Sequence, residues 1–182
     1  MNETLEDAVR SFDITIDEWL ERYRGHPLFD RVMTTATHAG EFSTVWHIAS
    51  VVRGTIRGRP DQVIALAIGI GAESLIVNQG VKRLFRRERP TESGDDRYDV
   101  RRPSTSAFPS GHASAAAFAA VTLIRWSRGR TSPIWLTMAV VVGASRAVVR
   151  IHHASDVVGG ALTGITLARV LARPLDRLAG RR

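Results

Sequence analysis

The most constraining feature of this sequence is a series of apolar stretches, each about the length of one helix, separated by short polar breaks. The stretches lie at about residues 32–52, 61–81, 112–126, 133–149 and 156–172. The breaks contain Gly, Pro, Ser and Arg, residues that are typical of turns and helix ends. This alternation predicts an all-α fold, a helical bundle.

Hydropathy alone does not decide whether these helices cross a bilayer. A spanning helix needs about 20 mostly apolar residues, whereas several of these runs are shorter, and His38, Glu41 and Glu73 lie inside them. The arginines favour insertion, because those at 53–59, at 125–130 and near the C-terminus would share one side of a five-helix zigzag. The loop 82–109 and the turn 146–153 would then lie on the opposite side.

Residues 1–25 form a separate amphipathic pattern. Apolar side chains recur every three or four positions among Glu, Asp and Arg, namely Leu5, Val9, Phe12, Ile16, Trp19, Leu20 and Tyr23. This spacing predicts a helix with one apolar face, which would lie on a membrane surface or cap the bundle. The acidic start is unlike a secretory signal.

Composition limits the chemistry. The 182 residues, which predict a single domain over 1–182, include no cysteine, so disulfides, thiol nucleophiles and thiolate metal sites are excluded. The formal net charge is +7, which suits anionic partners such as phosphates, nucleic acid or an acidic membrane surface. Lys82 is the one lysine among 25 basic residues.

A first cluster of cations follows the 61–81 run. Lys82 and Arg89 are separated by six residues, nearly two helical turns, and Pro90 follows. If the helix continues to Pro90, both cations project from one face and can hold an oxyanion. The alternative is a solvated basic helix end.

A second cluster is Pro109-Ser110-Gly111-His112, directly before an alanine-rich run. We expect Ser110 to cap the helix and Gly111 to let an anion approach the free backbone N–H groups. His112, in the first turn, would face the same ligand and could transfer a proton. The alternative is an ordinary capped helix with an incidental histidine.

A third cluster contains Arg146, His152 and Asp156, with His153 as a rival to His152. On a helix, Asp156 would lie one turn beyond His152 and accept a hydrogen bond from one imidazole nitrogen, which leaves the other nitrogen free as a nucleophile. Arg146 can hold phosphate oxygens through two hydrogen bonds. The alternative is a polar network at a helix boundary.

In this order and spacing, the three clusters resemble the type 2 phosphatidic acid phosphatase (PAP2) superfamily. Its pattern is Lys, six residues, Arg-Pro; then Pro-Ser-Gly-His; then Ser-Arg, five residues, His, three residues, Asp, and every position is met between residues 82 and 156. The chain resembles the short bacterial membrane members, of the undecaprenyl diphosphatase type. That resemblance implies about five transmembrane helices after the amphipathic helix.

The resemblance also implies a role for each motif residue. His152 would attack phosphorus and form a phosphohistidine, Asp156 would orient it, and His112 would protonate the leaving group. The phosphate-binding groups would be Lys82, Arg89, Ser110, Gly111 and Arg146. No metal or other cofactor is expected, because three cations and a helix N-terminus can replace a magnesium ion, and no carboxylate cluster lies near the motifs.

The expected function is therefore a metal-independent integral membrane phosphatase that acts on a lipid phosphate or diphosphate, with polyprenyl diphosphate as the first substrate and phosphatidic acid among the next. The expected partners are that substrate and membrane lipids, without nucleic acid, and the active site would face the extracytoplasmic side. The oligomeric state is left open.

Three other functions are compatible with these residues. A vanadate-dependent haloperoxidase and a non-lipid acid phosphatase would use the same oxyanion site, and a basic binding protein would not need His152. Arginines at 86, 87, 97, 101 and 102 would recognise a second phosphate or form a solvated loop face.

Overall fold

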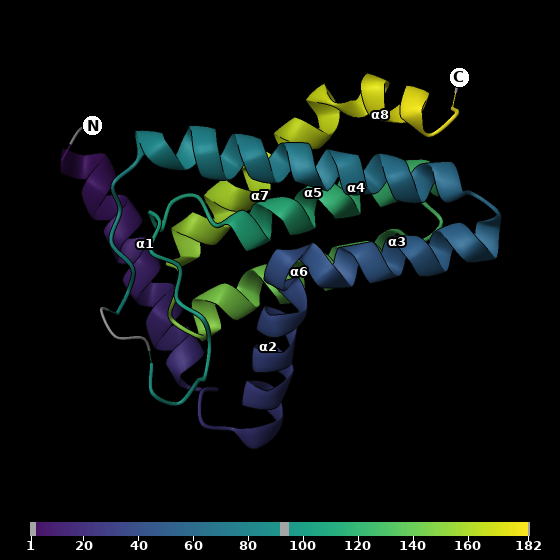
Figure 1. The fold of residues 1–182 in the computed structure, drawn as a ribbon. Coiled ribbons are helices and arrows are strands. Elements are labelled where there is room, and N and C mark those ends of the chain that lie inside the picture. The colour runs from purple at the N-terminus through teal and green to yellow at the C-terminus, as the bar shows by residue number, and fades with distance from the viewer. Residues whose placement is uncertain (1–2, 92–94, 182) are drawn as a thin grey trace.

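The computed structural model describes residues 3–91 and 95–181, and within these ranges the regular structure is entirely helical, which confirms the all-α prediction (Figure 1). Residues 1, 2, 92–94 and 182, which belong to the predicted N-terminal helix, the long loop and the chain end, lie outside the described residues. The helices are α1 (Glu3–Glu21), α2 (Pro27–Gly40), α3 (Thr44–Arg57), α4 (Pro60–Leu75), α5 (Gly111–Trp126), α6 (Ser132–Val148), α7 (Ala154–Val170) and α8 (Ala172–Leu178).

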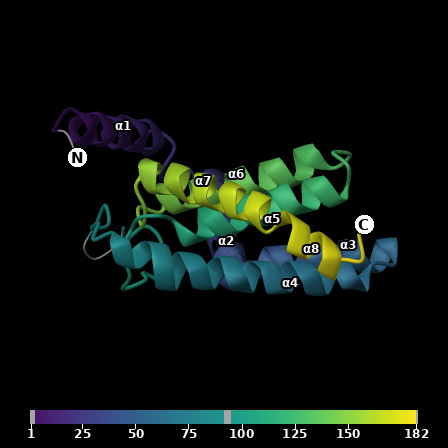
Figure 2. The ribbon, with the colours of Figure 1, turned by 90° about the horizontal axis from the view of Figure 1, so that it is seen from above.

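Helix α5 forms the centre of the bundle. Its alanine-rich stretch is buried almost throughout, and Phe118, Leu123 and Trp126 on the same helix join the main apolar core. Helices α4, α6 and α7 pack around it, and the small alanine side chains let them approach closely (Figures 1 and 2). The helix that carries Ser110, Gly111 and His112 at its start is therefore held from several sides.

Two glycines bring α7 into direct contact with the backbone of α5. A Cβ atom on Gly160 would lie 2.3 Å from the carbonyl oxygen of Ser110, and one on Gly164 would lie 2.1 Å from that of Ser114. No larger residue fits at either position without moving a backbone. The first turns of α5 and α7 consequently lie side by side at one end of the bundle.

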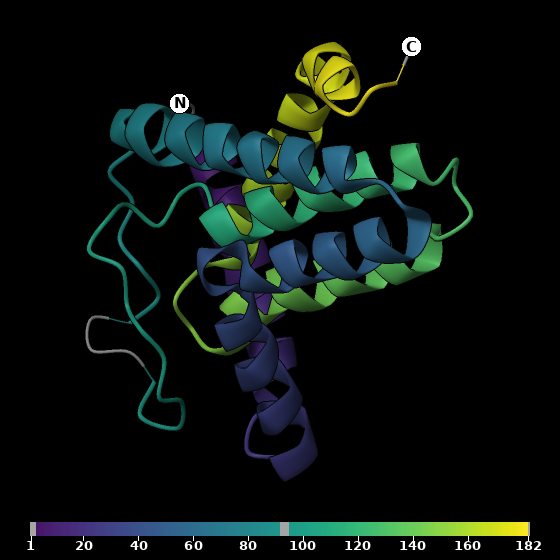
Figure 3. The same ribbon diagram turned by 45° about the vertical axis from the view of Figure 1, so that its right-hand side comes forward.

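The apolar stretch at 32–52 is two helices, which corrects the expectation of one. Residues Glu41–Ser43 form a short 3₁₀ turn in which Phe42 and Ser43 have φ values of 51° and 58°. Helices α2 and α3 consequently run in different directions (Figures 1 and 3). Gly40 lies beside the break, where a Cβ atom would come within 2.8 Å of the His112 ring, so α2 ends against the candidate site.

Helix α4 is extended by irregular turns towards the same end. A π turn at Ile76–Gly80 and a 3₁₀ turn at Val81–Leu84 follow Leu75 without a break, and Phe85 is already extended. Irregular turns of this kind re-aim the side chains that they carry. They direct buried Lys82 towards the start of α5.

Helix α1 caps the bundle, one of the two positions expected for it. It crosses the end of the bundle where α7 begins (Figures 1 and 2). Leu20 packs with Val148, Val149 and Ile151 in a small second core. The turns between α3 and α4 and between α5 and α6, with their arginines, lie at the opposite end, as the zigzag arrangement predicts.

The count of five spans is not confirmed. By length and composition, one described helical segment is able to cross a membrane, Pro60–Leu84, which is 25 residues long. A second qualifies if α7 and α8, bent by 59° at their junction, count as one span. Helix α6 is apolar but has 17 residues, and α3 has 14, fewer than the roughly 20 that cross an average bilayer.

We expect Gly164→Ala to lower the midpoint of thermal unfolding. The added methyl group has no room against the Ser114 carbonyl, and overpacking of this kind costs about 1–3 kcal/mol. The matched control is Gly71→Ala on α4, where a Cβ atom meets nothing within 4 Å. That change should be neutral or slightly stabilising, because alanine favours the helix. Equal midpoints for both variants would contradict the close contact of α5 and α7.

Candidate active site

The three motif segments meet where α5 and α7 begin. The Ser110 N–H donates a hydrogen bond to the carbonyl oxygen of Asp156 at 3.0 Å, which joins the two helix starts. His112 lies within electrostatic range of Arg146, His152, Lys82 and Arg89. All eight residues that the sequence nominates are therefore brought to one place.

Ser110 caps α5, as predicted. Its hydroxyl oxygen accepts a hydrogen bond from the Ala113 N–H at 3.5 Å, and the side chain is fully buried. A Cβ atom on Gly111 would lie 3.5 Å from Asn78 Oδ1 and 3.9 Å from Lys82 Nζ. The missing side chain therefore leaves the N–H groups of the first turn open towards Lys82, where a helix N-terminus favours an anion.

Lys82 and Arg89 converge, but not from one helix face, which corrects the expectation for this pair. The helix ends at Leu84, five residues before the arginine, and Arg89 lies in extended chain. Its guanidinium donates to the carbonyl oxygens of Pro103, Ile151 and Thr105 at 3.1, 2.6 and 3.0 Å. Backbone acceptors from two other segments fix its position, rather than helical periodicity.

Arg146 is buried and forms no ion pair among the described residues. Its side chain is 1% exposed, and its Nε and Nη1 atoms have no hydrogen-bond partner. Nε2 of His112, which is nearby, is also buried and unpaired. Buried donors are normally satisfied, and a buried charge normally has a partner. These orphaned groups therefore mark a place for an anionic ligand.

His152 lies in the turn between α6 and α7, which corrects the expectation that it shares a helix with Asp156. Its N–H donates to the Arg146 carbonyl at 3.1 Å, and Arg150 in the same turn has a φ of 54°. The imidazole is 3% exposed, with Nε2 3.3 Å from Arg89 Nη1. The side chain of the rival, His153, lines a cavity on the side of α1.

Asp156 lies behind the histidine. Its Oδ2 atom is 3.6 Å from His152 Nδ1, longer than a hydrogen bond, and accepts the His153 N–H at 2.8 Å. Its Oδ1 atom accepts from Arg87 Nη1 at 2.7 Å. Asp156 is at the third position of α7, and a carboxylate there can bind the N–H that precedes the helix. This local contact, rather than a shared helix, brings Asp156 to Nδ1.

The surroundings of His152 favour the neutral imidazole. Burial lowers its pKa to about 4, assisted by the positive charges of Arg89 and Arg146, while Asp156 opposes the change. A neutral ring has an unprotonated nitrogen at physiological pH. With Nδ1 facing Asp156, that nitrogen is Nε2, on the side of Arg89 and the other cations.

The loop arginines are not simply a solvated face. Arg87 pairs with Asp156 and Asp13, and Arg97 pairs with Glu21 and Asp95. Nothing in the sequence of the loop distinguishes Arg87 from the neighbouring arginines, so its ion pairs were not predicted. Glu73, whose place was uncertain, faces the interior and accepts a hydrogen bond from the Ser114 hydroxyl.

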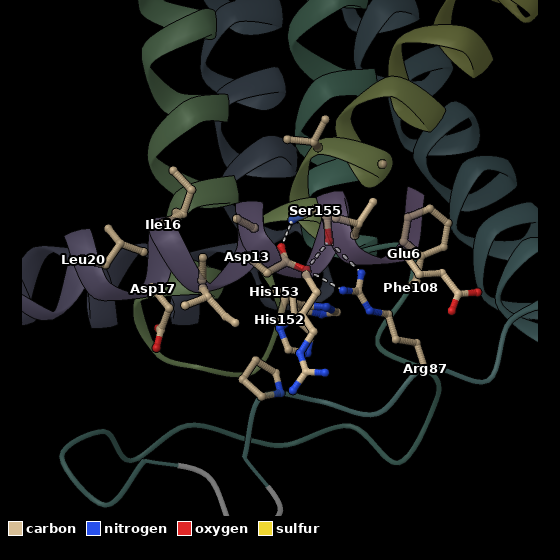
Figure 4. A pocket seen from close by; sticks show the side chains of 18 of the residues that line it. Glu6, Asp13, Ile16, Asp17, Leu20, Arg87, Phe108, His152, His153 and Ser155 are labelled. Carbon is tan, nitrogen blue, oxygen red and sulfur yellow. Dashed lines mark hydrogen bonds and ion pairs between the residues drawn. The ribbon is translucent and has the colours of Figure 1, made fainter. Parts of the chain in front are cut away.

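A cavity of about 1200 Å³ lies between α1, α7 and the loop (Figure 4). His152 and Arg87 line it together with apolar residues such as Leu20, Phe108 and Val158. Lys82, Arg89 and Arg146 are not among its lining residues. The cavity therefore reaches the histidine from the side of α1, and not from the side of these three cations.

The chain is similar to known proteins in sequence. Residues 62–177 match the model of the PAP2 superfamily. The chain is 31% identical to decaprenylphosphoryl-5-phosphoribose phosphatase of Mycolicibacterium smegmatis over 86% of this chain and 84% of the relative. It is 29% identical to the putative undecaprenyl-diphosphatase YbjG of Escherichia coli over 57% of this chain and 52% of the relative.

A solved structure shares the fold. It is a transmembrane PAP2-type phosphatidylglycerolphosphate phosphatase from Bacillus subtilis, with a TM-score of 0.69 and 27% sequence identity. The match covers 93% of this chain and 87% of the other. The relatives in both comparisons are named as phosphatases of phosphorylated lipids.

We expect an oxyanion to stabilise the folded protein through Arg146. Orthovanadate or phosphate at 100 times its dissociation constant should raise the free energy of unfolding by about 2.7 kcal/mol, and so raise the midpoint of thermal unfolding. Arg146→Met should lose most of this rise. Without the anion it should unfold no earlier than wild type, because it removes an unpaired buried charge. An equal rise in the variant would show that the anion binds elsewhere.

Because the pKa of His152 is lowered in the folded protein, we expect the stability of the fold to depend on pH. Between about pH 6.5 and pH 4 the unfolded imidazole takes up a proton that the folded one does not. Stability should therefore fall as the pH drops through this window, and His152→Gln should flatten that part of the curve. The unfolding midpoints of both proteins from pH 7 to pH 4.5 test this, and parallel curves would contradict it.

Proposed function

The chain belongs to the PAP2 superfamily, and from its site we propose that it is a phosphatase that removes a phosphate group from a membrane lipid through a phosphohistidine intermediate. The observation that carries the proposal is the buried, unpaired guanidinium of Arg146 beside His152 and His112. A fixed cation without a counterion is suited to a phosphoryl group, which brings its own negative charge.

The geometry supports the following sequence of steps. Nε2 of His152 attacks phosphorus, and the bond from phosphorus to the leaving oxygen breaks as His112 donates a proton to that oxygen. His112 takes up this proton when the substrate binds, because the negative charge of the phosphate offsets the neighbouring cations. His112 then takes a proton from water, which attacks the phosphohistidine and releases phosphate. Asp156 faces Nδ1 and stabilises the positive charge that the ring gains.

Three cations would hold the transferred phosphoryl group. Lys82, Arg89 and Arg146 surround the position that Nε2 faces, and the open N–H groups at the start of α5 add donors. In phosphoryl transfer most of the acceleration comes from positioning and charge stabilisation. We therefore propose that the reaction needs no metal ion, because the protein's own cations supply that charge.

The substrate we propose is a polyprenyl lipid that carries a phosphate monoester on a sugar, or a polyprenyl diphosphate. The first follows from the likeness to decaprenylphosphoryl-5-phosphoribose phosphatase, which extends over most of both chains. The second follows from the shorter likeness to an undecaprenyl-diphosphatase. In both, the terminal phosphate lies at the polar end of a molecule with a large apolar polyprenyl chain.

We further propose that the bundle is a multi-pass membrane protein, with the whole chain acting as one domain. Helices α3, α4, α6 and α7 expose large apolar side chains around the bundle. Soluble monomers rarely expose such continuous apolar surface. The exposed residues include Ile48, Val52, Ile56, Ile64, Ile68, Ile134, Leu136, Val140, Val158 and Leu162.

The active site would face the extracytoplasmic side. The turns between α3 and α4 and between α5 and α6 carry Arg57, Arg59, Arg128 and Arg130 at the end of the bundle away from the site (Figures 1 and 2). Such arginines favour the cytoplasmic side of a membrane. The helices that would span are short, so this topology implies a thin or locally thinned bilayer around the bundle.

We expect the detergent-purified protein to release phosphate from these lipids in the presence of EDTA. The assay compares decaprenylphosphoryl-5-phosphoribose, undecaprenyl diphosphate and phosphatidic acid. His152→Ala should fall to background, because it removes the nucleophile. The matched control is His153→Ala, which keeps the backbone N–H that binds Asp156 and should retain activity.

Two results would contradict the proposal. Release that stops in EDTA and returns with a divalent ion would refute metal independence. Activity retained by His152→Ala would refute the phosphohistidine. Wild type denatured in alkali during turnover should also carry a phosphate label that is stable in alkali and lost when acid is then added, as expected for an N–P bond, and His152→Ala should carry none.

A further inference from the structure

Asp13, on the N-terminal helix, is buried at the edge of the site. The residue is 7% exposed. Oδ1 accepts the Ser155 N–H at 2.8 Å, and Oδ2 accepts the Ser155 hydroxyl at 2.8 Å. Asp13 therefore caps the first turn of α7 from outside that helix, where a negative charge is favoured.

Arg87 joins this carboxylate to Asp156. Nη2 of Arg87 lies 2.6 Å from Asp13 Oδ2 (Figure 4). Nη1 of Arg87 lies 2.7 Å from Asp156 Oδ1. Nη1 also donates to the Ser155 hydroxyl at 2.7 Å. One planar guanidinium thus bridges two carboxylates from α1 and α7, a geometry that charge-assisted hydrogen bonds fix closely.

The bridge restricts the carboxylate that faces the histidine. Asp156 is fully buried, with Oδ1 held by Arg87 and Oδ2 held by the His153 N–H. Rotation of the carboxylate about its own axis would break both bonds. The remaining face of Oδ2 lies towards His152 Nδ1 at 3.6 Å, so a small displacement of Asp156 would form or abolish the contact with the imidazole.

We propose that Asp13 and Arg87 are positioning residues for Asp156, so that the docking of α1 sets the alignment of His152. This rests on the proposed function, in which Asp156 orients the nucleophile. Asp13 also shares Arg87 with Asp156, so the guanidinium is not neutralised by Asp156 alone. The second carboxylate leaves Asp156 with more negative charge to stabilise the ring during attack.

The test is a pair of variants and their combination, measured on the full chain in detergent. Asp13→Asn and Arg87→Gln should each lower kcat at least about tenfold, as loss of an outer hydrogen-bond partner commonly does. KM and the vanadate-induced rise in unfolding midpoint should stay close to wild type, because Lys82, Arg89 and Arg146 are untouched. The kcat of the double variant should be no lower than that of the less active single variant, since both changes act through Asp156.

The matched control is Asp17→Asn, one turn further along α1. Asp17 pairs with Arg24 and Arg150, away from Asp156, and is 42% exposed in its side chain. The control should keep kcat within about twofold of wild type, because partly exposed ion pairs contribute roughly 1 kcal/mol or less. An equal loss in Asp17→Asn, multiplying losses in the double variant, or full activity in Asp13→Asn would each overturn the proposal.

A readout without substrate separates this proposal from the proposed function. In protein labelled with ¹⁵N-histidine, the imidazole resonances of His152, assigned by their absence in His152→Gln, should shift in Asp13→Asn and stay in place in Asp17→Asn. Unchanged resonances in Asp13→Asn would overturn the positioning role even if no lipid is hydrolysed. A wild type that is inactive on every lipid, with shifted resonances, would refute the function and leave the positioning role supported.

Discussion

The arrangement of the site depends on the close contact between the starts of α5 and α7. Gly160 and Gly164 let the backbone of α7 lie against the carbonyl oxygens of α5, and the hydrogen bond from Ser110 to Asp156 joins the two first turns. One helix start carries His112 and the open N–H groups of the first turn, and the other carries the carboxylate that faces His152. Neither helix would assemble this site alone, and their separation is fixed by backbone rather than by side chains that could adapt.

The cations and the carboxylates near this contact differ in whether they form ion pairs. The cations nearest the histidine form no ion pair in the described part of the chain, while Asp13, Asp156 and Glu21 are engaged by other arginines. Asp156 is bound by Arg87, and Glu21 is bound by Arg24 and Arg97, which lower the pKa of Glu21 to about 2. The site thus keeps its positive charge available for a ligand at the cost of burying it, a cost that the ligand can offset.

The sequence predicted the members of the site better than the way in which they meet. The motif spacings identified Ser110 as a cap and His152 with Asp156 as a pair, because local chemistry at a helix start determines both. The break at Phe42 was missed, since neither proline nor glycine occupies the two residues that take positive φ values. The sequence does contain a signal for Asp13. It lies on the same helical face as Val9, Ile16 and Leu20, where the periodicity predicts an apolar residue. Which loop arginine would reach it depends on tertiary structure and is not encoded in local pattern.

The main-chain acceptors of Arg89 affect which substitutions in the surrounding loop leave the guanidinium in place. Every strong bond of its guanidinium to the rest of the protein ends on a main-chain carbonyl, in Pro103, Thr105 or Ile151. Main-chain acceptors are present whatever the side chains are. A change of side chain at Pro103, Thr105 or Ile151 therefore leaves the acceptor of Arg89 in place, provided that the backbone keeps its path. The position of Arg89 depends on the course of the main chain, rather than on which side chains the loop carries.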